Sequence, residues 1–196
     1  MLLFLLVVFL LILYFTLDVH YFIRVAGCFL FAKFFRKKIT ITDPSEIYGV
    51  VLPSDVDFMM THMNNSRYLR EYDFARFDHA TRTGVMDEVL KRGGSFPVSA
   101  ITIRYRLPAM LFSPYKIVTQ PVFWDSKFIY LDQRLVTLKD GIVRSVGYTK
   151  IACVKFDGEE IIKKLFPDVT KPAMPEDLKK WAESCELSSE MMKKSK

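Results

Sequence analysis

Residues 54–84 read SDVDFMMTHMNNSRYLREYDFARFDHATRTG, and this stretch decides both the fold and the candidate site. Either Asn64 or Asn65 can cap a helix, because a side-chain amide oxygen accepts a hydrogen bond from a free N–H of the first turn. The residues that follow place apolar side chains at helical spacing, which predicts a long helix ending near Thr83. Those apolar positions are Tyr68, Leu69, Tyr72 and Ala75.

Two carboxylates and a histidine precede the predicted helix start. Asp55 and Asp57 stand in a turn-like segment, and His62 follows them. A helix N-terminus presents unpaired N–H groups and a partial positive charge, so it suits a developing oxyanion. A plainer interpretation is also open, because an Asp-x-Asp pair is common in turns and a lone histidine is more often a surface or core residue.

This pattern resembles the thioesterase motif of the hot-dog superfamily, in particular its 4-hydroxybenzoyl-CoA thioesterase-like family. That family has an Asp-x-Asp turn, then His-x-Asn-Asn-x-x-Tyr-Leu, then a long helix that carries acidic residues and an Ala-Arg pair. One difference is the spacing, since His62 comes five residues after Asp57 where the family most often has four. The matching residues are Asp55, Asp57, His62, Asn64, Asn65, Tyr68, Leu69, Asp73, Ala75 and Arg76.

The resemblance implies an α+β fold with a single hot-dog domain, in which a long antiparallel sheet wraps around a central helix. We expect this domain over residues 46–158. The resemblance also implies an acyl-CoA thioesterase-like function, with an acyl thioester of coenzyme A or of an acyl carrier as substrate. It further implies a homodimer whose active sites lie at the subunit interface. The alternative is a catalytically inactive acyl-binding or scaffold protein.

Three residues are expected to be catalytic on the basis of this resemblance. Asp57 is the expected nucleophile or water-activating carboxylate. His62 and Asn64 are expected to position the water or the thioester. Asp55 is expected to be a turn former.

Three further residues are expected to bind the substrate. Backbone N–H groups near the helix start would bind the oxyanion, which implicates Asn65 and Ser66, and Tyr68 lies on the following turn. Asn65 has the alternative role of a cap alone. On the same helix, Glu71 is expected to be a surface charge, whereas Asp73 is a weaker candidate for an acidic partner in the pocket.

Other chemistries are not indicated. The sequence has no Gly-x-Ser-x-Gly, no His-Glu-x-x-His, no Cys-x-x-Cys and no glycine-rich phosphate loop, so we expect no metal and no cofactor. The net charge of +6 fits attraction to the phosphates of coenzyme A or to anionic lipid, as well as an ordinary basic surface. Basic residues interleaved with stacking aromatics are confined to the membrane-proximal stretch, so we expect no nucleic-acid partner.

The rest of the domain is expected to be a meander of antiparallel strands. Alternating apolar and polar residues mark the strands, and Asp140-Gly141 is a strong turn signal. Pro121 is expected at a bulge or a sheet edge. A short helical segment is expected over 87–92. The expected strands are 46–52, 99–107, 115–124, 128–138 and 142–156.

The N-terminus is expected to be a membrane segment. Residues 1–23 are almost wholly apolar and reach the ~20 residues that span a bilayer, which predicts a transmembrane or signal-anchor helix. Residues 24–45 form a basic and aromatic juxtamembrane linker. Within it, 29–35 is expected on the membrane surface or, alternatively, as a second helix packed on the domain. Cleavage as a signal peptide, giving a secreted protein, is the alternative for 1–23.

The expected location is the endoplasmic reticulum membrane with the domain in the cytosol. Positive charges follow the apolar segment, and the positive-inside rule then leaves the domain cytosolic. Cys28, Cys153 and Cys185 are odd in number and widely spaced, which fits a reducing compartment.

Residues 159–196 are expected to form a helical C-terminal extension. Pro175 to Leu187 is expected to be a helix that Trp181 anchors to the domain, because proline and acidic residues favour the first turn. The terminal residues 193–196 resemble a dilysine retrieval signal, although a frayed basic terminus is the alternative.

Overall fold

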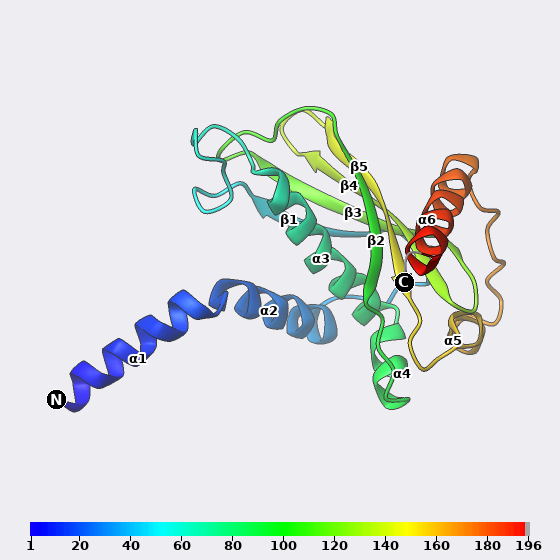
Figure 1. Cartoon of the computed structure of the whole chain (residues 1–196), viewed down its shortest axis with the longest axis horizontal. Helices are drawn as coiled ribbons and strands as arrows, with labels where there is room; N and C mark the ends of the chain where they lie inside the picture. Colours follow the sequence, from blue (N-terminus) through cyan, green and yellow to red (C-terminus); the bar gives the residue numbers. More distant parts are fainter. Residues whose placement is uncertain (195–196) are drawn as a thin grey trace.

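The computed structural model describes residues 1–194 and shows an antiparallel sheet curved around one long helix, α3, Asn65–Arg82 (Figure 1). The sheet has the order β1-β3-β4-β5-β2, so β1 and β2 are its edge strands. This arrangement confirms the expected single hot-dog domain. The strands are β1 Ser45–Val50, β2 Val98–Tyr105, β3 Pro114–Trp124, β4 Phe128–Thr137 and β5 Val143–Ala152, and the other helices are α1 Leu2–Thr16, α2 Val19–Phe35, α4 Val85–Lys91, α5 Gly158–Leu165 and α6 Glu176–Lys194.

The main core lies between α3 and the sheet. Tyr68, Tyr72 and Ala75 are buried, as their helical spacing predicts, and Phe74 is buried with them while Leu69 is only half-buried. A helix with this much apolar surface must be covered, and the curved sheet covers one side of it. The facing side chains from the strands and the adjoining loops are Ile47, Val51, Met63, Ala109, Tyr115, Ile117 and Leu135.

The strand predictions hold with small shifts at the ends. The register between β3 and β4 shifts between Pro121 and Phe123, which confirms the bulge expected at Pro121. β5 ends at Ala152, four residues before the predicted end, because the chain turns there towards α5. α6 continues to Lys194, beyond the predicted Leu187. The last two residues of the expected dilysine signal, 195 and 196, lie outside the described residues.

The expected single membrane helix over 1–23 is not what the chain forms. α1 and α2 meet at a break with a bend of 74°. No helix within residues 1–194 is by itself long and apolar enough to cross a bilayer, whereas α1 and α2 together have the length and composition of a broken span. Asp18 explains the break, because its Oδ1 accepts a hydrogen bond from the Tyr21 N–H at 3.2 Å and so caps a new helix.

α2 packs against α3, which corrects the expectation that Glu71 is a surface charge. Arg24 forms a two-bond ion pair with Glu71, with nitrogen–oxygen distances of 2.5 and 2.7 Å, and the Glu71 side chain is buried. Arg70 pairs with Asp18 at 2.7 Å in the same contact. α2 therefore packs on the domain, although its outward face keeps exposed aromatic side chains, so the membrane-surface location expected for 29–35 stays a prediction. Those side chains are Phe22, Phe31, Phe34 and Phe35.

Replacing Arg24 tests this ion pair. Arg24→Met is expected to lower the free energy of unfolding by about 3 kcal/mol, because it leaves a buried carboxylate without its countercharge. The value lies at the low end of the usual range since 26% of the Arg24 side chain is exposed. Arg24→Met/Glu71→Leu, which removes both charges, should recover most of the loss. Denaturation of the full chain in detergent, monitored by circular dichroism, measures the free energy of unfolding of both variants. Equal stability of Arg24→Met and the wild type would show that the ion pair does not stabilise the fold.

Candidate functional site

The segment before α3 folds back on itself as a tight hairpin. The Asp57 N–H donates to the His62 carbonyl at 3.0 Å, and Val56 pairs with Met63 in an antiparallel bridge. The hairpin absorbs the extra residue between the aspartate and the histidine, since Met60 adopts a left-handed φ of 58°. This fold places Asp57 directly across from His62. His62 lies two residues before Asn64, the N-cap of α3.

The Asp57 carboxylate points towards the His62 ring on the opposite arm of this hairpin. Its Oδ2 lies 3.9 Å from the His62 Nδ1, and its Oδ1 accepts a hydrogen bond from the Thr61 N–H at 3.4 Å. The Thr61 hydroxyl lies 2.8 Å from the same His62 nitrogen. The Asp57 side chain is 18% exposed, so it is held by its neighbours but still reachable by water. A carboxylate and an imidazole are therefore available together for proton transfer.

Asn64 caps α3. Its Oδ1 accepts hydrogen bonds from the Ser66 N–H at 3.0 Å and the Ser66 hydroxyl at 2.8 Å, and its carbonyl accepts from the Arg67 N–H at 2.9 Å. The Ser66 N–H, one of the expected oxyanion donors, is thus already engaged. The Asn65 N–H donates to none of the residues in 1–194, so it is the donor at this helix start that remains open.

A notch of about 290 Å³ opens at this helix start. Tyr68 is fixed in its wall, because its hydroxyl accepts a hydrogen bond from the Ala109 N–H at 3.1 Å. The Tyr105 hydroxyl donates to the Asn65 carbonyl at 2.9 Å and closes the other side. The lining residues are His62, Asn65, Tyr68, Tyr105, Arg106, Leu107 and Pro108.

The notch brings together part of the predicted site. His62, Asn65 and Tyr68 line it together. Asp57 lies beside His62 but is not among the lining residues, and Asn64 and Ser66 hydrogen-bond each other in the cap. Asp55 is a turn residue as expected, because its buried carboxylate accepts the Leu52 N–H at 3.0 Å.

A second, largely apolar cavity of about 250 Å³ lies along the C-terminal half of α3. One part of its wall is charged: the Tyr21 hydroxyl donates to Asp73, and Arg76 pairs with Asp73 at 2.7 Å. Burial, followed by the contact with Asp73, raises the pKa of Tyr21 to about 12. Burial also lowers the pKa of Arg76. The apolar lining includes Ile41, Phe77, Val85, Phe96, Pro97, Ile129, Leu131 and Ile151.

Sequence reasoning missed Tyr21 as a partner of Asp73, because Tyr21 falls inside the apolar stretch assigned to the membrane. A signal was present. Asp18, Tyr21 and Arg24 recur every third residue at the end of that stretch, which places polar groups on one face of a helix. Such a face in an otherwise apolar segment indicates a polar partner, and α3 supplies it.

His79 sits in the wall of this cavity as a neutral, buried imidazole. Its Nδ1 lies 3.1 Å from the Ser45 hydroxyl, and the residue is only 4% exposed. Burial, together with the positive charge of Arg82, lowers the pKa of His79 to about 4, although Asp43 and the Ile41 carbonyl act in the opposite direction.

This lowered pKa predicts acid sensitivity. Between its ordinary value of 6.5 and about 4, the unfolded chain binds a proton at His79 that the folded chain does not. The free energy of unfolding therefore falls as the pH drops through this range, by about 2 kcal/mol from pH 7.5 to pH 5 for this one group. His79→Gln should reduce the pH dependence by that amount, measured as the difference in unfolding free energy at the two pH values. An unchanged pH dependence would contradict the assignment.

Comparison with known sequences agrees with this architecture. The family model of the Thioesterase-like superfamily matches residues 51–182. Protein THEM6 of Drosophila melanogaster is 42% identical over 187 residues, which cover 95% of this chain and 97% of that protein. Protein THEM6 of Xenopus laevis is 36% identical over 178 residues, covering 90% and 86%. These matches confirm the resemblance drawn from the motif around Asp57 and His62.

Solved structures share the fold. YbaW, a probable thioesterase from Escherichia coli, aligns over 61% of this chain and 94% of its own with a TM-score of 0.57 and 23% identity. Slr0204, a 1,4-dihydroxy-2-naphthoyl-CoA thioesterase from Synechocystis, aligns over 66% and 100% with a TM-score of 0.56 and 12% identity. Identities this low carry the fold alone. The family match and the sheet wrapped around α3 together show that this chain belongs to the thioesterase-like superfamily of hot-dog proteins.

Proposed function

We propose that this protein binds acyl thioesters, of coenzyme A or of an acyl carrier, at the notch before α3 and hydrolyses them. The observation that carries the proposal is the hairpin that sets the Asp57 carboxylate across from His62 at the start of a capped helix. Membership of a thioesterase-like family supports the same reaction class.

The chemistry follows from the groups at the helix start. Asp57 takes a proton from a water molecule, or attacks the thioester carbonyl itself, and the carbonyl oxygen becomes an oxyanion. The open Asn65 N–H and the helix dipole stabilise that negative charge. In the first route the activated water attacks the carbonyl, and collapse of the intermediate breaks the carbon–sulfur bond; the thiolate leaves and takes up a proton. In the second route the same collapse leaves an acyl–Asp57 anhydride, which a water molecule then hydrolyses to restore the carboxylate. The products are a carboxylic acid and the free thiol, and the sequence motif assigns no metal or cofactor to this reaction.

A second candidate function is acyl binding without turnover. It is favoured by the position of Asp57, which lies outside the residues that line the notch. The apolar cavity along α3 could hold an acyl group of roughly eight non-hydrogen atoms. This estimate assigns each atom about 30 Å³, the volume that one water molecule occupies in the liquid. In this function the protein holds the acyl group and does not cleave it.

We further propose that two copies of the chain complete the site. β2 is an edge strand of eight residues, so its outer backbone groups lack a partner strand within residues 1–194. An edge of this length is a natural place for strand pairing with another copy. The notch at the end of β2, beside Tyr105, would then gain a second wall.

Attachment to the endoplasmic reticulum membrane, with the domain in the cytosol, is also proposed. α1 is uncharged and almost entirely exposed, and α2 keeps an exposed aromatic face beside the exposed Lys33, which suits a bilayer surface. The positive charges after α1 and the lysines near the C-terminus support this orientation.

Asp57→Asn tests the proposed hydrolysis. With a panel of acyl-CoA thioesters, the variant is expected to lower kcat/KM by about 10²- to 10⁴-fold, because the general base or nucleophile is lost. Release of free thiol measures turnover, and acyl-CoA binding is measured in parallel.

Asp55→Asn is the matched control. It makes the same chemical change two residues away, in a side chain that only accepts a backbone hydrogen bond, so turnover should persist. Binding without turnover in the wild type and in both variants would favour the second function. Equal turnover in the wild type and Asp57→Asn would exclude the proposed role of Asp57.

A further inference from the structure

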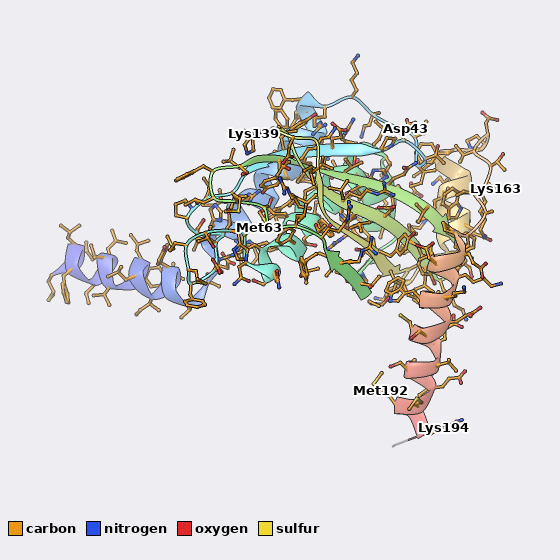
Figure 2. The ribbon with its side chains drawn as sticks, turned by 90° about the horizontal axis from the view of Figure 1, so that it is seen from above. Asp43, Met63, Lys139, Lys163, Met192 and Lys194 are labelled. Carbon is orange, nitrogen blue, oxygen red and sulfur yellow. The ribbon has the colours of Figure 1, made fainter. Side chains whose placement is uncertain are left out.

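A groove on the other face of the sheet contains a lysine, Lys150, most of whose side chain is buried. It lies between α6 and the sheet, at the side where α6 extends away from the body towards Met192 and Lys194 (Figure 2), and its volume is about 480 Å³. Its lining is rich in hydroxyl groups and contains no carboxylate. The lining residues are Ser99, Ala100, Phe128, Lys150, Ser184, Cys185, Ser188, Ser189 and Met192.

The groove is separate from the helix-start site. Side chains alternate between the two faces of a strand. In β5, Thr149 points to the face of the sheet that packs on α3, and its hydroxyl donates to the side chain of Gln133 in β4. Its neighbour Lys150 therefore points to the opposite face. Tyr130, directly across from Lys150, belongs to the cluster that packs under α6 with Leu178.

α6 is packed on the sheet and forms one wall of the groove. Leu178 is fully buried, Trp181 stacks on Tyr148 with a ring separation of 6.3 Å, and the Tyr148 hydroxyl donates to Asp177 at 2.9 Å. These contacts confirm Trp181 as an anchor. One turn further along the same helix face, apolar residues give way to Ser184 and Ser188, which the four-residue spacing turns towards the sheet.

Lys150 is the unusual residue in this groove. It is 5% exposed, and its ammonium lies 3.9 Å from the centre of the Phe128 ring and 5.8 Å from that of Tyr130. These ring contacts stabilise a cation only in part. No carboxylate within residues 1–194 forms a salt bridge with it, and its ammonium nitrogen is not among the fully enclosed, unpartnered atoms of that part of the chain, so it opens into the groove.

The other buried charges of the described chain all have partners. Arg82 pairs with Asp78, Glu71 with Arg24, and Glu88 with two cations. Burying a charge is costly unless it is paired or hydrogen-bonded. Lys150 differs from these residues, because its ammonium has no carboxylate partner within residues 1–194 and opens into a groove lined by hydroxyl groups, where an anionic ligand can reach it.

We propose that this groove binds the phosphate monoester group of a small organic ligand. The Lys150 ammonium supplies the countercharge, and the hydroxyls of Ser184, Ser188 and Ser189 supply donors for the several acceptor oxygens of a phosphate. The groove would hold about sixteen non-hydrogen atoms at roughly 30 Å³ each, so it has room for an organic body attached to the phosphate.

Isothermal titration of the full chain in detergent tests the proposal with two probes, inorganic phosphate and glycerol 3-phosphate, and with glycerol as the neutral match. The wild type is expected to bind glycerol 3-phosphate more tightly than inorganic phosphate and not to bind glycerol. Lys150→Met keeps the apolar stem and removes the charge, so it should weaken glycerol 3-phosphate binding at least tenfold. Lys139→Met removes the same charge from an exposed turn and should leave binding unchanged.

Ser188→Asp gives an independent variant in case Lys150→Met does not fold. It places a carboxylate in the groove opposite the ammonium, so it should abolish phosphate binding while the unfolding temperature stays the same or rises. Three results would each overturn the proposal: no binding of either phosphate probe to the wild type, binding to Lys150→Met within twofold of the wild type, or unchanged binding to Ser188→Asp.

Discussion

The hydrogen bonds of Gln133 tie the central helix to the middle of the sheet. Gln133 is fully buried, and its amide nitrogen donates to the Tyr72 carbonyl at 2.9 Å and the Thr119 hydroxyl at 3.0 Å. Its amide oxygen accepts from Arg76 at 3.0 Å and from Thr149 at 2.9 Å. Every donor and acceptor of the amide is satisfied, which is the condition for keeping such a group inside a core. This network fixes the position and rotation of α3 relative to the sheet. The notch and the apolar cavity depend on that position, because residues of α3 line both.

The same network connects the N-terminal segment to the interior. Arg76 bonds Gln133 on one side and Asp73 on the other, and Asp73 accepts the hydrogen bond of Tyr21 from α2. α2 is therefore part of the cavity wall as well as a candidate membrane-surface helix. A movement of α2 would reach the cavity through these contacts, because Arg24 and Glu71 hold the two helices together.

Much of the fold was predictable from local pattern. The spacing of Tyr68, Tyr72 and Ala75 identified the central helix, and alternation identified the strands, because each pattern reflects which face of one element must be buried. The motif from Asp57 to Tyr68 indicated the family and three of the residues that line the notch, since those residues lie close together in sequence. The bulge at Pro121 was also foreseeable, because proline cannot donate to a ladder.

What the sequence by itself determined is therefore local: most of the elements, their buried faces, and the turn and cap before α3. Only the tertiary structure decided that α2 leaves the apolar stretch at Asp18 and docks on α3, that Glu71 is buried, and that Lys150 lies without a countercharge under α6. The reason is physical. Each of these outcomes depends on a partner far away in sequence, and the pattern around one residue carries no information about which distant charge or ring will pack against it.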